Sequence, residues 1–276
     1  MTRFRELALA LPSALIVASS GAEVRAEVPG AGDGGREKSE LIVFAAASLR
    51  EAFAKLGEDF KRQHPGVEVT FNLGGSQELR LQIEQGAAAD VFASADRRHM
   101  NALKEQKLVV EDEVFARNEP VLAVPSKNSA VKSFEDLPKA KRIVVAAPEV
   151  PIGGYTAQIL ERAYHRYGES FRQAVQSSIV SKELNVRQVL AKVKLEEADA
   201  GIVYRTDVSS AGTGAIPIAI PAELNAVAEY PIAAVKAAPH PKLAEDWIEL
   251  VSSPAGRKAL AEFGFLPPTT TARRSR

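Results

Sequence analysis

Short apolar runs alternate with helix-patterned segments along most of the chain. Residues 41–46 are continuously apolar, as expected for a strand that is buried on both faces of a sheet. In residues 49–63 the apolar side chains recur at helical spacing, and the sequence His64-Pro65-Gly66 ends this pattern. The first pair of elements is therefore predicted to be a strand followed directly by a helix.

The same alternation continues to the end of the chain. It predicts strands at residues 67–72, 91–94, 120–124, 143–147, 200–204, 216–220 and 230–235. It predicts helices at residues 77–85, 97–106, 134–137, 154–167, 186–195, 241–251 and 254–263. This order indicates an α/β fold with open, mixed but mostly parallel sheets flanked by helices. In such folds ligands bind beyond the carboxyl ends of the strands, where the helices begin.

The two ends of the chain differ from the region between them. Arg3 and Arg5 precede a short apolar stretch, and the small residues around Ala26 suit cleavage, so residues 1–26 are predicted to be an export signal peptide. Residues 27–40 are rich in glycine and charge and are expected to form a flexible leader. Residues 269–276 are polar and basic and are expected to be a disordered tail.

Composition excludes several classes of protein. Lys+Arg and Asp+Glu are equal at 35 each, which argues against a nucleic-acid-binding protein. Cysteine is absent, so disulfides, thiolate metal sites and cysteine nucleophiles are excluded. The 4 histidines are scattered, and His64 and His99 are expected on the surface. After export, the protein is expected to be soluble.

Two predicted strand-to-helix turns place a serine between small residues and a helix. Ser48 follows three alanines, and Ser76 follows Gly74 and Gly75. Each serine could simply cap its helix. Alternatively, each hydroxyl could donate to an anion together with the free amides of the first helical turn. The sequence pattern alone leaves both interpretations open.

Further along, three elements offer similar chemistry. The turn APEVPIGGYT (147–156) is stiffened by two prolines, and its glycines are expected to open a helix with exposed amides. Asn185 is a candidate cap for the helix that starts at Val186. Tyr204 ends a short strand, where its phenol could pack in the core or donate into a cleft. Neither GxxxxGK[ST] nor GxGxxG occurs, which argues against a nucleotide ligand.

The motifs together resemble one known family, the periplasmic molybdate-binding proteins of ATP-driven importers. The resemblance is carried by AAASL (45–49), GGSQEL (74–79), GAAADVFASAD (86–96), APEVPIGGY (147–155), NVRQVL (185–190) and DAGIVY (199–204). It extends over about residues 41–268. It implies a two-lobed type II periplasmic-binding-protein fold with a hinge of two crossover strands, and a tetrahedral dianion, molybdate or tungstate, held between the lobes.

The resemblance also implies particular residues and boundaries. The molybdate oxygens would be bound by the hydroxyls and amides of two serines, by two further amides and by one phenol, without direct coordination of the metal: Ser48, Ser76, Ile152, Val186 and Tyr204. Ile152 departs mildly from the small residue common at its position, which a backbone donor tolerates. Glu149 and Glu183 are the nearest acidic residues and are expected to be solvated. The lobes would comprise residues 41–122 with 228–268, and residues 123–227.

The implied function is high-affinity periplasmic binding of molybdate or tungstate and delivery to an ABC-transporter permease. No cofactor, no catalytic residue and no nucleic-acid partner is expected, and the protein is expected to be a monomer. The main alternative is a receptor for another tetrahedral oxyanion, such as sulfate or phosphate. A serine hydrolase using Ser48 or Ser76 is a remote alternative, because neither serine lies in GxSxG. A regulatory sensor domain is a third.

Overall fold

The computed structural model describes residues 39–127, 129–210 and 212–269. The predicted signal peptide and nearly all of the predicted leader and tail lie outside these residues. Ser39 and Glu40, which were assigned to the leader, instead begin the first strand. Among the described residues, no helix is both long and apolar enough to cross a bilayer.

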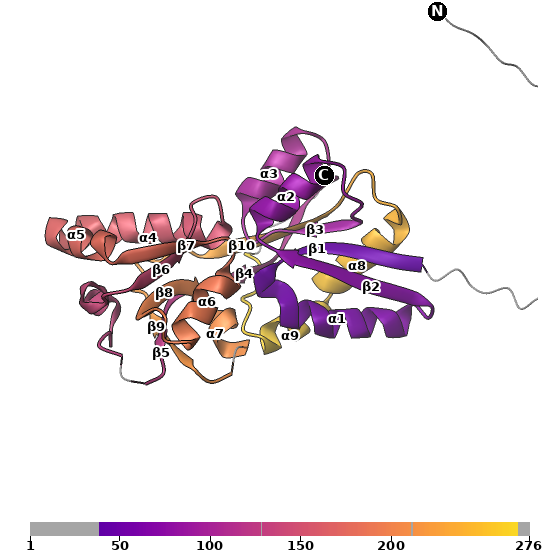
Figure 1. Ribbon diagram of the computed structural model, residues 1–276. Coiled ribbons are helices and arrows are strands. Elements are labelled where there is room, and N and C mark those ends of the chain that lie inside the picture. Colours follow the sequence, from indigo (N-terminus) through magenta and orange to yellow (C-terminus); the bar gives the residue numbers. More distant parts are fainter. Residues whose placement is uncertain (1–38, 128, 211, 270–276) are drawn as a thin grey trace, which may run out of the picture. The chain divides into compact units, whose positions relative to one another are not determined.

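The described chain forms two five-stranded sheets, each covered by helices (Figure 1). The first sheet has the order β2-β1-β3-β10-β4. Its strands are β1 (Ser39–Ala46), β2 (Val67–Gly74), β3 (Val91–Ala93), β4 (Glu113–Asn118) and β10 (Ala228–Ala234). The second sheet has the order β7-β6-β8-β5-β9. Its strands are β5 (Pro120–Pro125), β6 (Ile143–Ala146), β7 (Ile179–Glu183), β8 (Ala200–Tyr204) and β9 (Ala215–Ala219).

Helices accompany each sheet. The elements that accompany the first sheet are the 3-10 turn η1 (Ala47–Leu49) and the helices α1 (Arg50–Gln63), α2 (Ser76–Glu84), α3 (Arg97–Glu105), α8 (Pro241–Ser252) and α9 (Pro254–Glu262). The elements that accompany the second sheet are the 3-10 helix η2 (Phe134–Lys139) and the helices α4 (Pro151–Tyr167), α5 (Glu169–Ser177), α6 (Val186–Lys194) and α7 (Arg205–Ser210). Helices α2 and α3 lie on one face of the first sheet, and α1 and α9 lie on the other (Figure 1).

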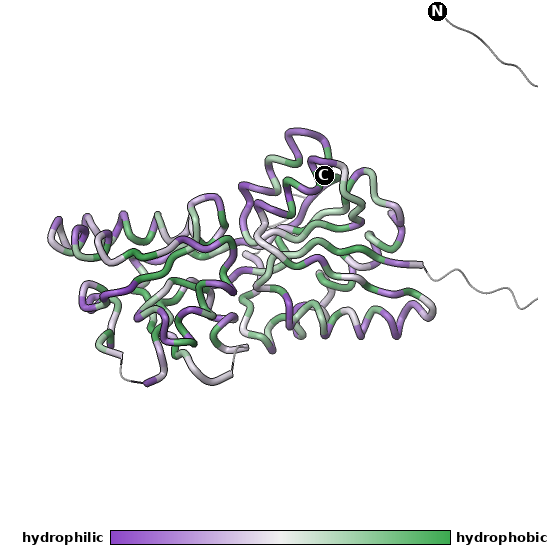
Figure 2. The backbone as a smooth tube through the Cα atoms, viewed as in Figure 1, coloured by the Kyte–Doolittle hydropathy of each residue, from purple (hydrophilic) through white to green (hydrophobic). Residues whose placement is uncertain are grey.

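The core forms where the apolar strands meet the apolar sides of the helices. Figure 2 shows hydrophobic residues along the central strands of both sheets, whereas the helices alternate between hydrophobic and hydrophilic residues. Under the first sheet, Trp247 is fully buried and its ring centroid lies 5.4 Å from that of Phe53 and 5.5 Å from that of Phe60. Burial of such large side chains contributes strongly to stability, about 1.5–3 kcal/mol for each one.

The chain changes sheet twice. It leaves the first sheet at Glu119, the single residue between β4 and β5, and returns between β9 and β10. The predicted division into two lobes at residues 122/123 and 227/228 stays a prediction. The first change of sheet lies a few residues before the predicted one, because the whole of β5 pairs with β8 and β9.

The sheets are mixed, as predicted, but they are not mostly parallel. In each sheet two neighbouring pairs are parallel and two are antiparallel. The antiparallel pairs all involve β5 or β10, the strands that follow the two changes of sheet and run back along their neighbours.

Some elements differ from the prediction. Strand β4, helix α5, strand β7 and helix α7 were not predicted, and helix α4 begins at Pro151 rather than at Gly154. In β4 the buried positions do not alternate, so the period of two that marks a strand is missing. At α4, proline suits the first helical position, since that amide needs no partner there.

Candidate functional site

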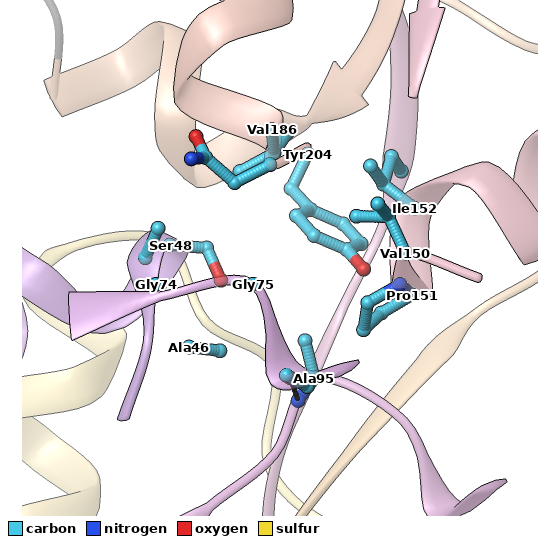
Figure 3. A pocket seen from close by; sticks show the side chains of 13 residues that line it. Ala46, Ser48, Gly74, Gly75, Ala95, Val150, Pro151, Ile152, Val186 and Tyr204 are labelled. Carbon is cyan, nitrogen blue, oxygen red and sulfur yellow. Dashed lines mark hydrogen bonds between the residues drawn. The ribbon is translucent and has the colours of Figure 1, made fainter. Parts of the chain in front are cut away.

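The carboxyl ends of strands from both sheets meet at one small cavity. Its lining residues are Ala46, Ala47, Ser48, Gly74, Gly75, Ser76, Ala95, Val150, Pro151, Ile152, Asn185, Val186 and Tyr204. Figure 3 shows Ser48 and Ala46 on one side and Tyr204, Ile152 and Val150 on the other. The centre of a water-sized sphere can occupy about 20 Å³ of this cavity. A single bound water requires slightly less than this.

The five residues expected to bind the ligand all line this cavity. Four of them stand at helix starts: Ser48 in η1, Ser76 as the first residue of α2, Ile152 as the second of α4, and Val186 as the first of α6. Amides of a first helical turn have no acceptor within the helix and carry partial positive charge. The cavity is thus surrounded by helix N-termini, which is an arrangement that favours an anion.

Neither serine hydroxyl caps its helix, so the capping interpretation is wrong for both. The Ser48 Oγ lies 2.9 Å from the Tyr230 hydroxyl. The Ser76 Oγ accepts a hydrogen bond of 3.1 Å from the Ala95 amide. The residue before α2 is Gly75, whose amide donates to the Glu78 carboxylate over 3.1 Å. Both hydroxyls are therefore held by partners outside their own helices, and both are buried.

On the opposite side, the two helix starts present apolar side chains. The side chains of Ile152 and Val186 belong to the hydrophobic core, so their available donors are the backbone amides. A Cβ added to Gly153 would lie 1.9 Å from the Ala147 carbonyl oxygen, which shows how closely α4 approaches the end of β6. Asn185 caps α6, as predicted, and its Oδ1 accepts from the Gln188 amide over 3.2 Å.

Tyr204 supplies a phenol at the end of β8. The residue is 1% exposed, and its hydroxyl has no hydrogen-bond partner among the described residues. Burial, and then the nearby Tyr230, raise the pKa of Tyr204 well above its ordinary value. The phenol therefore keeps its proton throughout the physiological range and is available as a neutral donor.

None of the residues that line the cavity carries a charge. The nearest charged group along α6 is Arg187, whose guanidinium binds the Glu51 carboxylate on α1 and lies 3.1 Å from Asp207 Oδ1. Asp207 is fully buried. Burial raises its pKa to about 7, and Arg187 acts in the opposite direction. These three residues form a network that joins α1, which packs with the first sheet, to α6 and α7, which pack with the second.

Other contacts join the two halves around the cavity. Gln77 Nε2 donates to the Leu184 carbonyl over 2.7 Å, and Arg98 donates to the Glu149 carbonyl over 2.7 Å. The His99 Nε2–H donates to the same Glu149 carbonyl over 2.8 Å. These bonds are consistent with a closed arrangement of the two halves.

His99 was expected on the surface, and this expectation is wrong. The residue is 4% exposed, because α3 packs on the first sheet and its N-terminus meets the loop before α4. Burial lowers the pKa of the His99 imidazole. The sequence of α3 is rich in polar residues, so it did not indicate that the loop containing Glu149, 50 positions away, would cover His99.

No carboxylate residue is among those that line the cavity. Glu183 pairs with Lys192 over 2.6 Å, and Glu149 is exposed, so neither of the nearest acidic candidates lines it. Within residues 39–127, 129–210 and 212–269, no group of three or more His, Asp or Glu residues could hold a metal ion. The chemistry offered by this site is hydrogen-bond donation to an anion.

Two residues that support the site from outside its lining were missed. Tyr230 on β10 touches Ser48, and Asn118 at the end of β4 donates to Tyr230 over 3.3 Å. No local sequence pattern could have identified them, because they lie 182 and 70 positions from Ser48 in the chain. They enter the site only through the pairing of β10 with β3 and β4.

Two helix-covered sheets joined by two crossings, with a donor-lined cavity between them, define a two-lobed solute-binding protein. The family model of bacterial extracellular solute-binding proteins matches residues 41–266, and the chain belongs to this family. Among curated relatives it is similar to the molybdate-binding protein ModA of Mycobacterium tuberculosis H37Rv. The two are 37% identical over 273 residues, which span 96% of this chain and all of the relative.

Solved structures share the fold. The periplasmic molybdate-binding protein of Azotobacter vinelandii aligns over 83% of this chain and all of that one, with a TM-score of 0.73 and 21% identity. The sulfate-binding protein SubI of Mycobacterium tuberculosis H37Rv aligns over 84% of this chain and 88% of that one, with a TM-score of 0.73 and 16% identity. These likenesses confirm the two-lobed α/β architecture.

Proposed function

We propose that this protein binds molybdate or tungstate in the periplasm and delivers it to the membrane permease of an ABC importer. The observation that carries the proposal is a small cavity between the two halves, whose lining includes hydrogen-bond donors from both and no charged side chain. The 37% identity to ModA over nearly the whole chain supports molybdate in particular.

The donors suit an anion that has no proton of its own. The Ser76 Oγ accepts from the Ala95 amide, so its own proton is free to point into the cavity. The Asn185 Oδ1, another oxygen on the lining, is occupied by the Gln188 amide. Such donors favour oxygens that carry charge rather than a proton, because a hydrogen bond to a charged acceptor is roughly twice as strong as one between neutral groups.

Neutral donors are sufficient to hold a dianion. Hydrogen bonds to a charged group contribute about 1.5–3 kcal/mol each. The four helix starts add partial positive charge that is fixed in place before the ligand arrives. Because these donors are mostly backbone amides, their positions cannot contract easily around a smaller anion. Selectivity for molybdate and tungstate over sulfate would then follow from the size of the cavity.

The donors come from both halves, which explains how binding could be coupled to transport. A ligand that bridges Ser48 and Ser76 on one half and Ile152, Val186 and Tyr204 on the other shifts the population toward the closed form. The closed surface would then be recognised by the permease. Export through the predicted signal peptide, action as a monomer, and the absence of a bound cofactor complete the proposal.

The serine-hydrolase alternative lacks support at the site. The Ser48 Oγ contacts a phenol and the Ser76 Oγ contacts a backbone amide, whereas a nucleophilic serine needs a general base at hydrogen-bond distance. We therefore place the protein among binding proteins, without catalytic activity.

Calorimetric titration of the purified protein with molybdate, tungstate, sulfate and phosphate tests the proposal directly. We expect tight binding with one site for molybdate and tungstate, and binding weaker by at least a hundredfold for sulfate and phosphate. Thermal unfolding should show the same ranking, because a ligand that binds only the folded state raises its stability. Preferential binding of sulfate or phosphate would favour the alternative oxyanion receptor, and no binding of any of the four would refute the proposal.

A further inference from the structure

The Ser48 hydroxyl is hydrogen-bonded to Tyr230, which lies 182 positions away in the sequence. The Ser48 Oγ and the Tyr230 hydroxyl oxygen are 2.9 Å apart, and either atom could be the donor. Tyr230 is fully buried and is not part of the cavity lining. Which of the two hydroxyls donates decides whether Ser48 keeps a proton for a ligand.

Asn118 settles this direction. Its Oδ1 accepts from the Glu119 amide over 2.9 Å, which fixes the orientation of the side-chain amide. The Nδ2 group therefore faces the other way and donates to Thr206 Oγ1 over 2.8 Å and to the Tyr230 hydroxyl over 3.3 Å. Both protons of this amide are used, and the Tyr230 oxygen is an acceptor toward Asn118.

The Tyr230 proton then has one acceptor in reach. Ser48 Oγ is the other hydrogen-bond partner recorded for this phenol among the described residues. If Ser48 donated instead, the buried phenol proton would be left unpaired, which costs about 1–3 kcal/mol. Burial also raises the pKa of Tyr230 well above its ordinary value, so the phenol stays protonated.

We propose that Tyr230, oriented by Asn118, is a positioning residue that turns the Ser48 hydroxyl into a donor aimed into the cavity. The chain of hydrogen bonds runs from Asn118 to Tyr230 to Ser48 and from there to an oxygen of the bound anion. The inference rests on the proposed function and adds to it two residues that do not touch the ligand.

Asn118 has a second consequence for the site. It lies at the end of β4, directly before the crossing to the second sheet, and its bond to Thr206 reaches α7, which follows Tyr204. The same side-chain amide is thus linked to a proposed ligand donor in each half. It reaches Ser48 through Tyr230, and it contacts Thr206, two residues after Tyr204. Hydrogen-bonded chains of this kind polarise one another, which strengthens the last donor of the chain.

A double-mutant cycle on molybdate affinity tests the inference. Tyr230→Phe removes only the phenol oxygen and should weaken binding about tenfold, because Ser48 can then turn its proton away from the ligand. In the Ser48→Ala background the same change should weaken binding by less than about twofold, since the group through which Tyr230 acts is gone. Tyr167→Phe, which removes the hydroxyl of a partly buried tyrosine at the end of α4 that donates to Glu135, is the matched control and should leave affinity unchanged.

The outcomes separate this inference from the proposed function. Equal losses from Tyr230→Phe in both backgrounds would show a purely structural role, and no loss in either would show no role; each overturns the inference alone. Failure of the unmodified protein to bind molybdate would overturn both proposals. If Tyr230→Phe does not fold, as judged by circular dichroism, Asn118→Leu takes its place and should weaken binding about threefold only when Ser48 is present.

Discussion

The two halves of the molecule face the same cavity with different chemistry. The half built on the first sheet presents side-chain hydroxyls, those of Ser48 and Ser76, each fixed by a partner outside its helix. The half built on the second sheet presents helix starts whose side chains, those of Ile152 and Val186, are apolar and buried in the core. The side-chain donors of that half are the Tyr204 phenol and the amide group of Asn185, which also lines the cavity.

This difference shows that side-chain donors and backbone donors to the same cavity restrict the sequence in different ways. A hydroxyl donor depends on the identity of its residue and on the neighbours that orient it. An amide donor depends on where a helix begins, and it tolerates any side chain that packs well. Substitutions that keep the backbone amide should therefore act on affinity in the first half and mainly on packing in the second.

The largest effect is expected from Ser76→Ala. The variant loses one hydrogen bond to a charged acceptor, about 1.5–3 kcal/mol, which corresponds to roughly 10- to 150-fold weaker molybdate binding. Calorimetric titration measures this loss, and circular dichroism verifies the fold. Ser177→Ala, an exposed serine of α5, is the matched control and should bind as the unmodified protein does. Unchanged affinity in Ser76→Ala would remove that hydroxyl from the site.

A pair of substitutions at Val186 separates the backbone from the side chain. Val186→Pro deletes the amide proton at the first position of α6, where proline is well accepted, and should weaken molybdate binding about tenfold or more. Val186→Ala keeps the amide and should change affinity by less than about threefold, although the smaller side chain lowers stability. Equal affinities of these two variants would contradict the assignment of this amide as a donor.

The buried network between the halves should make stability depend on pH. The pKa of Asp207 is about 7 in the folded protein and about 4 in an unfolded chain. Between these values the folded state holds a proton that the unfolded state has released. The free energy of unfolding should therefore fall as the pH rises through this window, by up to about 1.4 kcal/mol per pH unit.

Urea unfolding of the unmodified protein and of Asp207→Asn at pH 5 and pH 7.5 measures this contribution. The Asn variant cannot titrate, so the difference between the two proteins should grow in its favour toward pH 7.5. A difference that stays constant across this range would mean that Asp207 is ionised in the folded state throughout.

The smallest effect is expected from the ion pair that joins the halves. Glu51→Gln removes the charge that meets Arg187, and both side chains are partly exposed. Such a pair contributes at most about 1 kcal/mol, so molybdate binding should weaken about two- to fivefold, and less at high salt. Glu58→Gln, whose partner Lys61 lies on the same helix, is the control. A loss from Glu51→Gln that is independent of salt would point away from an electrostatic contact between the halves.

Most of the regular structure could be predicted from the chain alone. Continuous apolar runs marked strands such as β1 and β6, and proline, glycine and asparagine marked the helix starts around the cavity. These signals are local, since they depend on backbone preferences and on which face of an element is buried. The resemblance to a known family, carried by six short motifs, pointed to the five residues that the structure brings together around one cavity.

Tertiary structure decided what depends on residues far apart in the chain. The equal number of parallel and antiparallel strand pairs, the burial of His99, and the link from Asn118 through Tyr230 to Ser48 all arise from pairing and packing between distant segments. The sequence alone does not determine in which direction a serine hydroxyl donates its proton. For Ser48 the fold determines it, because the buried Tyr230 phenol must donate to an acceptor and the Ser48 oxygen is the acceptor within reach.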